Sequence, residues 1–301
     1  MRVNDLAVPD LGRLLAGGGL RLTVGPFTVH VGSPIGWFAR GLHLLYQEHP
    51  LETAQPFADF HVAVAAPVGP RRWVRPQARF EIDGRPLFHP VPVSQAIATF
   101  EWGLNWCIAN YSHQHLMIHA AVVERGGAAM LLPGDPGAGK STLCAALVHR
   151  GWRLLSDEMA LISLADHSLI PIPRPIALKN ESVEIIRRFA PDAVVGPVAR
   201  DTAKGAVAHV RPPADSVQRA PEPASPRWVV FPHYAADEPT TLTSQTRGKA
   251  FMRLAGHSFN YHVLGRLGFD TLGDLMDDVT AYDLRYSDLE DAVGRLGNLD
   301  S

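Results

Sequence analysis

The sequence predicts an α/β fold built around a P-loop nucleotide-binding core, with a small mixed α+β region before it. The prediction rests on three observations. The glycine-rich segment 134–142 fits the pattern Gly-x-x-x-x-Gly-Lys-Ser/Thr. The apolar run 128–132 before it is short enough for a buried strand, and residues 142–150 after it carry apolar side chains at helical spacing. A strand, a glycine loop and a helix in this order direct backbone N–H groups and the positive end of the helix toward one anion.

The loop by itself indicates a nucleoside triphosphate or a similar phosphate compound, and we expect the ligands to be ATP and Mg²⁺. Lys140 is expected to reach the β and γ phosphates, and the Ser141 hydroxyl to ligate Mg²⁺. No Asn-Lys-x-Asp motif follows the loop, and no Asp-x-x-Gly element is followed by glutamine, which argues against a GTPase. The residues expected to surround the phosphates are Gly134, Asp135, Pro136, Gly137, Ala138, Gly139, Lys140, Ser141 and Thr142.

Composition narrows the class of protein. The 301 residues are 46% hydrophobic and carry a formal net charge of −2, so there is no electrostatic case for binding nucleic acid or acidic membranes. No apolar run approaches the roughly 20 residues of a membrane span, and residues 1–15 lack the pattern of a signal peptide, so we expect a cytoplasmic protein.

Cys107 and Cys144 fall in helical apolar patterns and are expected to be buried thiols. The basic residues other than histidine are nearly all arginine, a bias that genome composition can explain. Lysine occurs only at Lys140, Lys179, Lys204 and Lys249.

Residues 1–93 are expected to form the N-terminal region, whose role the sequence does not indicate. Helices are predicted at 6–20 and 35–46, and strands through 20–31 and at 60–66. A hairpin is predicted at 79–88 because Asp83-Gly84 is a favoured hairpin turn.

Residues 94–301 are expected to form the nucleotide-binding domain. It should begin with a helix at 94–111 capped by Ser94, followed by strands at 116–123 and 128–132. A buried strand is predicted at 152–162 and a short helix at 182–189, whereas the Pro- and Gly-rich segment 190–226 is expected to be exposed and mobile, with one strand at 207–210. The remaining predictions are a strand at 228–231, helices at 249–259 and 271–279, a strand at 281–286, and a last helix at 288–296 capped by Ser287.

Three side chains outside the loop suit phosphoryl transfer. Asp157 and Glu158 follow an apolar run and lie 17 and 18 residues after Lys140, where one can take a proton from a hydroxyl and the other can hold metal. The alternative for this pair is a solvated strand end. His119, expected on the strand paired with the loop strand, is either functional or an ordinary core histidine.

These residues together resemble the HPr kinase/phosphorylase family. The likeness covers about residues 118–162: Ile118-His119-Ala120, the loop with Leu132-Pro133 before it, and the segment from Arg150-Gly151 to Asp157-Glu158. The segment 209–213, His-Val-Arg-Pro-Pro, is similar to a later arginine-proline element of the family. The chain as a whole looks closer still to HPr-kinase-related proteins found with peptide-modification genes.

The resemblance implies a nucleotide domain like that of phosphoenolpyruvate carboxykinase and transfer of phosphate to a serine hydroxyl of a peptide or small protein. By this analogy Asp157 is the base and His119 assists near the γ-phosphate. Lys140 and Arg211 stabilise the transferred group, and Ser141 and Glu158 hold Mg²⁺. Relatives form rings of subunits, so a homo-oligomer is implied as well, although the sequence carries no interface signature.

The sequence also departs from the family. The Glu-x-Arg-Gly signature is absent, and the segment 173–180 takes its place. Its Arg174 and Lys179 are either ligands for a phosphate or a substrate carboxylate, or ordinary solvated side chains. Two other functions stay open: a kinase for a metabolite such as an amino acid or sugar, and a nucleotide-binding regulatory or scaffold protein without turnover. Because binding alone needs only the loop, the presence of His119, Asp157 and Arg211 favours an enzyme.

Overall fold

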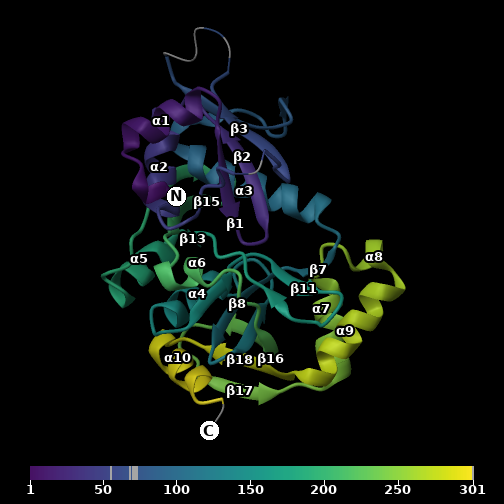
Figure 1. The fold of residues 1–301 in the computed structure, drawn as a ribbon. Coiled ribbons are helices and arrows are strands. Elements are labelled where there is room, and N and C mark those ends of the chain that lie inside the picture. Colours follow the sequence, from purple (N-terminus) through teal and green to yellow (C-terminus); the bar gives the residue numbers. More distant parts are fainter. Residues whose placement is uncertain (55, 68, 70–73, 300–301) are drawn as a thin grey trace.

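The computed structural model describes residues 1–54, 56–67, 69 and 74–299, and it is a mixed α/β protein (Figure 1). One large sheet belongs to the N-terminal third of the chain, and a second carries the glycine-rich loop. Two three-stranded sheets accompany them. The α/β class that the sequence predicts is therefore found.

The first sheet has the strand order β1 (Leu20–Val24), β2 (Phe27–Gly32), β3 (Phe60–Ala65), β4 (Gln77–Ile82) and β5 (Arg85–Pro86), with β6 (Val91–Pro92) also paired to β4. Alternate residues of β1 and β2 are buried, so one face of the sheet packs on a core. The helices that supply the rest of this core are α1 (Val8–Ala16), α2 (Gly36–Tyr46) and α3 (Ala96–Tyr111).

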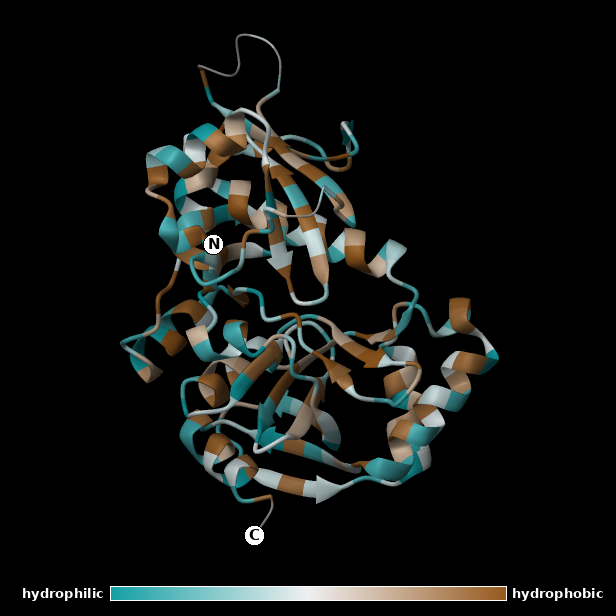
Figure 2. Cartoon of the chain, in the orientation of Figure 1, coloured by the Kyte–Doolittle hydropathy of each residue, from teal (hydrophilic) through white to brown (hydrophobic). Residues whose placement is uncertain are grey.

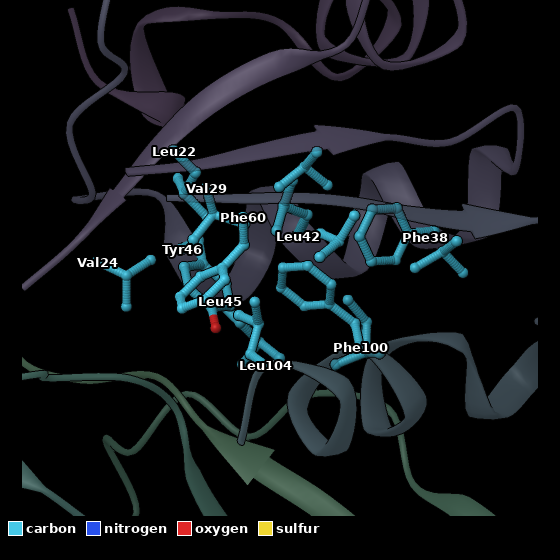
Figure 3. Packing of buried hydrophobic residues seen from close by; sticks show 14 of the residues in the cluster. Leu22, Val24, Val29, Phe38, Leu42, Leu45, Tyr46, Phe60, Phe100 and Leu104 are labelled. Carbon is cyan, nitrogen blue, oxygen red and sulfur yellow. The ribbon is translucent and has the colours of Figure 1, made fainter. Parts of the chain in front are cut away.

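Aromatic and leucine side chains fill the space between the first sheet and its helices. Phe38 of α2 and Phe100 of α3 meet edge to face with ring centroids 5.2 Å apart (Figure 3). Helix α3 thus packs into the core of the first sheet although it follows residue 93. The domain division at 93/94 stays a prediction, and its C-terminal limit at residue 301 lies outside the described residues.

Short-range sequence signals in this region are confirmed. Asp83 and Gly84 both have positive φ, 49° and 72°, as a two-residue hairpin turn between β4 and β5 requires. The predicted cap of α3 is wrong. Ser94 lies inside the short 3₁₀ turn Val93–Gln95, and Gln95 occupies the N-cap position without a side-chain hydrogen bond.

The second sheet has the order β10 (Arg153–Ser156), β8 (Ala120–Arg125), β9 (Ala128–Pro133), β16 (Ser225–Tyr234), β18 (Thr280–Tyr286) and β17 (Thr241–Ser244). Strand β16 is parallel to both β9 and β18, so the carboxyl ends of the three strands meet at one edge. The glycine-rich loop follows β9 at that edge, which is where open α/β sheets bind ligands.

Helices cover both faces of the second sheet. Buried residues of α4 (Lys140–Val148), α5 (Glu181–Phe189) and α10 (Leu289–Gly297) share one core, and those of α7 (Arg247–Gly256) and α9 (Arg266–Asp278) share another. The short helices α6 (Ala214–Gln218) and α8 (Tyr261–Leu264) contact β10 and β7. Figure 2 shows hydrophilic and hydrophobic residues alternating along the helices that surround the sheets.

The predicted cap of the last helix is displaced by one residue. Asp288 accepts a hydrogen bond from the Asp291 N–H at 2.7 Å, whereas the Ser287 hydroxyl donates to the Glu238 carbonyl.

Two long strands predicted from apolar runs are each broken in two. The run 116–123 becomes β7 (His115–Ile118) and β8, separated at His119. The run 152–162 becomes β10 and β11 (Ala160–Ser163), separated at residues 157–159. Strands β7 and β11 leave the second sheet and pair with each other, with β12 (Leu169–Ile170) on the far side of β11. The strands are buried on both sides of each break, so the apolar pattern continues through the change of sheet.

The segment 190–226 is more ordered into secondary structure than predicted. The remaining small sheet, β13 (Ile176–Lys179), β15 (Gly205–Val210) and β14 (Ala199–Thr202), takes two of its strands from it. The strand predicted at 207–210 is confirmed, but these residues are buried, so the expected exposure is wrong for them. Within the described residues, no helix combines the length and apolar composition that a membrane span requires.

Candidate functional site

The glycine-rich loop rests on the carboxyl ends of β16 and β18. Gly139, the N-cap of α4, has φ 92°, and Gly137 has φ 91°, a region open to glycine. The Tyr234 N–H donates to the Ala138 carbonyl at 3.3 Å, and the Tyr286 hydroxyl donates to the Gly139 carbonyl at 3.3 Å. Hydrogen bonds from β16 and β18 therefore hold the loop in place, and its backbone continues directly into α4.

A methyl group at Gly139 should disturb this arrangement more than one at Gly134. A Cβ on Gly139 would lie 2.3 Å from the Tyr286 hydroxyl oxygen at a left-handed φ, whereas a Cβ on Gly134 meets its nearest atom at 3.4 Å. We expect Gly139→Ala to lower the unfolding free energy by about 1–3 kcal/mol. Thermal unfolding of the two variants measures the difference. Equal melting temperatures would show that the loop relaxes freely at this point.

Lys140 begins α4 and folds back over the loop. Its ammonium group donates to the Gly134 carbonyl and, at 3.5 Å, to the Asp135 carbonyl. The residue is buried, and burial lowers the pKa of this lysine, while the charges of Glu158 and Asp157 act in the opposite direction. A cation is thus held at the mouth of a backbone loop, where it can contact a phosphate.

Asp157 and Glu158 lie in the connection between β10 and β11, where the Ser156 hydroxyl accepts from the Met159 N–H at 3.2 Å. Asp157 is 6% exposed, so a solvated strand end is excluded for it. Its Oδ2 accepts from the Ala177 N–H at 2.8 Å, and its Oδ1 is buried without a hydrogen-bond partner. Burial, followed by the neighbouring charge of Glu158, raises the pKa of Asp157 to about 7. The Ala177 N–H and the Ser141 hydroxyl act in the opposite direction and lower it. A carboxyl group with such a pKa can accept a proton near neutral pH.

His119 lies at the junction of β7 and β8, not within a strand paired to β9 as predicted. Its backbone N–H donates to the His257 backbone carbonyl at 2.8 Å, and the centroid of its ring lies 5.7 Å from that of Phe259. The Nε2 atom is 3.9 Å from the Glu158 Oε1. Burial, followed by the charge of Lys140, lowers the pKa of His119 to about 4, so the ring is neutral at pH 7 and can act only through hydrogen bonds.

Two adjoining cavities surround these residues. The loop cavity has a volume of about 480 Å³, and the aspartate cavity has a volume of about 20 Å³. The loop cavity is lined by His119, Asp135, Pro136, Gly137, Gly139, Lys140, Ser141, Thr142, Glu158, Ala177, Lys179, Asn180, Ser182 and Lys204. The aspartate cavity is lined by Glu101, Trp102, Asn105, Ser156, Asp157, Glu158, Ile172, Arg174, Pro175, Ala177, Lys179, Lys204 and His209. Four residues line both cavities: Glu158, Ala177, Lys179 and Lys204.

The rear wall of the aspartate cavity is a buried polar network that reaches into the first sheet's core. The Arg174 guanidinium lies 3.3 Å from the Glu101 carboxylate and donates to the Asn105 side chain. Tyr46 donates to the other Glu101 oxygen at 2.5 Å. Burial raises the pKa of Glu101, while the charge of Arg174 opposes the rise. Arg174 is thus buried and paired, and the interpretation of it as a solvated side chain is wrong.

Arg211 is not brought to these cavities. It does not line either of them in the described part of the chain, and its backbone N–H donates to the Val194 carbonyl at 2.9 Å. Its role as a phosphate-contacting arginine stays a prediction.

Sequence reasoning missed Glu101, His209 and Lys204. Glu101 lies inside an apolar pattern and gave no local signal, and His209 begins the segment 209–213, which was noted only for Arg211. The third had one: Lys204 is one of only four lysines in the chain, and three of the four line the loop cavity.

No group of three or more His, Cys, Asp and Glu side chains that could hold a metal occurs among the described residues. A Mg²⁺ ion that binds with nucleotide phosphates needs only one or two protein ligands, and keeps phosphate oxygens and water for the rest. Ser141 and Glu158, which both line the loop cavity, satisfy that smaller requirement.

The loop, the lysines and the paired acids define a candidate phosphate-binding site with acid–base groups beside it. Comparison with curated proteins points to the same class. Residues of this chain are 31% identical over 107 positions to the HPr kinase/phosphorylase of Lactobacillus delbrueckii subsp. bulgaricus, covering 30% of this chain and 34% of that protein. They are 29% identical over 99 positions to the HPr kinase/phosphorylases of Streptococcus equinus and Streptococcus mutans, covering 33% of this chain and 28% of each relative.

No family model matches the chain. The matched segments span about a third of the curated relatives' length, so the relationship to HPr kinase/phosphorylase is a distant one. It suggests a kinase-like protein.

Proposed function

We propose that the protein is a P-loop kinase that transfers the γ-phosphoryl group of ATP, with Mg²⁺, to a serine hydroxyl of a peptide or small protein. The observation that carries the proposal is the pair of adjoining cavities with a common wall. One contains the glycine-rich loop and Lys140, and the other contains the unpartnered oxygen of Asp157. A phosphoryl donor and a hydroxyl acceptor can then meet without either leaving its own subsite.

The loop cavity is the proposed nucleotide side. Backbone N–H groups at the start of α4, together with Lys140, bind the phosphates. Ser141 and Glu158 would hold Mg²⁺, which supplies neutralisation of phosphate charge. His119, which is neutral, can donate one hydrogen bond to the transferred group.

The aspartate cavity is the proposed acceptor side. Asp157 Oδ1 accepts the hydroxyl proton as the hydroxyl oxygen bonds to the γ-phosphorus. The bond from that phosphorus to the β–γ bridging oxygen breaks, and ADP leaves. Positioning and charge neutralisation provide most of the rate in such reactions.

The size of the aspartate cavity limits the acceptor. At about 20 Å³ it holds roughly one water-sized group, so only a small reactive end such as the hydroxymethyl of serine fits. The distant relatives are HPr kinase/phosphorylases, which favours a protein acceptor. A small metabolite with a hydroxymethyl group fits the same cavity, and a metabolite kinase is therefore the second candidate function.

The proposal includes three features carried over from the family resemblance. Residues 94–301 form the kinase domain, with residues 1–93 as an attached region. Arg211 is the arginine that the resemblance assigns to the transferred group, although it lines neither cavity among the described residues. The chain forms a homo-oligomer.

Incubation with γ-labelled ATP, Mg²⁺ and separate pools of peptides, small proteins and metabolites tests the function. Label on a serine of a peptide or protein supports the proposal, and label on a metabolite alone supports the second candidate. Tight ATP binding with no transfer to any pool or to water, unchanged in Asp157→Asn, would instead identify a nucleotide-binding scaffold.

A further inference from the structure

The four lysines of the chain all lie next to the glycine-rich loop. Lys140, Lys179 and Lys204 line the loop cavity. Lys249 lines a third cavity of about 870 Å³ on the other flank of the loop, together with residues 134–138. Elsewhere in the sequence the basic side chains are arginine. Lysine offers a compact point charge, which suits a group that moves during a reaction better than a fixed bidentate fork does.

Lys179 and Lys204 stand at the junction of the two cavities. Both line the loop cavity and the aspartate cavity. No carboxylate oxygen lies within 4.0 Å of either ammonium nitrogen in the described part of the chain. Burial lowers the pKa of Lys204, and the charge of Lys179 lowers it further, while Glu158 acts in the opposite direction. Lys204 is exposed and Lys179 is half-buried, so an anion can reach both ammonium groups, and binding between them relieves their mutual repulsion.

Lys204 is built into its position. It lies in the turn between β14 and β15, where its N–H donates to the Thr202 hydroxyl at 3.0 Å and Gly205 provides the positive φ that closes the hairpin. Its ammonium group lies 5.5 Å from the Trp102 ring centroid, a cation–π contact with α3. Lys179 comes from the neighbouring strand β13, which pairs with β15 through Lys179 and Val207. The small sheet of β13, β15 and β14 therefore presents both cations together.

A second observation indicates that a polar ligand enters the junction. Three buried atoms that have no hydrogen-bond partner belong to side chains lining the aspartate cavity: Asp157 Oδ1, Arg174 Nε and His209 Nε2. Each of these residues is at most 6% exposed. A buried polar atom without a partner is unfavourable. A bound hydroxyl can donate to Asp157 Oδ1, and an oxyanion can accept from the Arg174 Nε–H.

We propose that Lys179 and Lys204 form a phosphoryl-binding pair opposite the loop, and that Lys204 is a catalytic residue that contacts the phosphoryl group as it passes from the loop cavity to the aspartate cavity. This inference rests on the proposed function and adds a residue that no motif in the sequence indicates.

The chemistry requires a cation at this point. As the γ-phosphorus leaves the bridging oxygen and approaches the acceptor oxygen, negative charge spreads over its three equatorial oxygens. Lys140 neutralises the side of the phosphoryl group that faces the loop, and Lys179 and Lys204 neutralise the side that faces the sheet of β13, β15 and β14. Neither lysine gains or loses a proton in the step: the acceptor proton goes to Asp157 and the electron pair of the broken bond stays on ADP.

Replacement of Lys204 by methionine tests the inference, because methionine keeps most of the side-chain volume over Trp102 and removes the charge. We expect kcat for transfer, or for hydrolysis of ATP if no acceptor is known, to fall about 10²–10³-fold. The Kd of ADP should change less than about threefold, since the loop still holds its phosphates. Lys204→Arg should recover part of kcat. The matched control is Arg200→Met, which removes an exposed cation from the same hairpin and should change neither quantity.

Binding of ADP with tetrafluoroaluminate provides a readout that needs no acceptor. The wild-type protein should bind ADP more tightly when fluoroaluminate is present, and Lys204→Met should lose most of this gain. Equal gains in the two proteins, or a kcat within threefold of wild type, would overturn the inference. So would a parallel loss of ADP binding, which indicates a structural role. If the wild-type protein binds ADP but binds it no more tightly with fluoroaluminate, the inference is overturned and the proposed function is not. If the wild-type protein binds no ADP, both are overturned.

Discussion

Lys140→Ala is expected to abolish nucleotide binding or turnover, with a loss of at least about 10²-fold in kcat/KM. The ammonium group lies at the mouth of the loop, bonded to two loop carbonyls, and it is the cation of α4 that lines the loop cavity. Without it the backbone N–H groups face the phosphates with no compensating charge. Equilibrium binding of a fluorescent ATP analogue and the rate of ATP consumption measure the two effects.

The same substitution should leave the fold intact. A buried ammonium group without an ion pair is costly, as the lowered pKa of Lys140 indicates, so its removal does not weaken the native state by much. Thermal unfolding of Lys140→Ala should match the wild type within a few degrees. Arg266→Ala, which removes an exposed cation of α9, is the control for loss of charge and should bind the analogue normally. If Lys140→Ala binds the analogue with the wild-type Kd, the loop is not the nucleotide site.

Features set by local chemistry were predictable from the sequence. The loop, the Asp83-Gly84 turn and the burial of Cys107 and Cys144 each follow from a few neighbouring residues, and all are found in the structure. The two breaks at His119 and at residues 157–159 were not predictable in this way. Each falls within a run that is buried on both faces, and only pairing with a distant strand decides that the chain changes sheet there.

The candidate site likewise contains residues that local sequence patterns reveal and residues that only tertiary contacts bring there. Asp157 and Glu158 could be found because they stand together after an apolar strand. Arg174 was recognised as a residue of interest, but its ion pair with Glu101 joins segments 73 positions apart, and no local pattern reveals such a contact. Lys204 reaches the cavities only because β15 pairs with β13, so its position is a consequence of tertiary structure.

Asp157→Asn is expected to lower kcat by about 10²–10⁴-fold, the usual contribution of a general base. Asparagine has nearly the same shape, and its carbonyl oxygen can still accept from the Ala177 N–H. It cannot take the proton of the acceptor hydroxyl. Steady-state rates at saturating ATP provide the measurement, and Asp166→Asn, an exposed carboxylate in the turn between β11 and β12, is the control that should keep full activity.

The pH dependence gives this prediction a sharper test. The carboxylate is the active form and burial raises its pKa to about 7, so kcat/KM of the wild type should rise about tenfold per pH unit below pH 7 and level off above it. The residual activity of Asp157→Asn should lack this rise. The unfolding free energy should change with pH in the opposite direction to kcat/KM. Because the folded-state pKa lies above the ordinary aspartate value of 3.8, the wild type loses stability as pH rises from about 4 to about 7.

The uncharged asparagine does not lose this stability, so Asp157→Asn should melt at a temperature equal to or above that of the wild type at pH 8. An inactive variant that is also more stable would separate the role of Asp157 in the reaction from any role in the fold. A rate within threefold of wild type, or a wild-type profile that is flat between pH 6 and pH 8, would show that another group takes the proton.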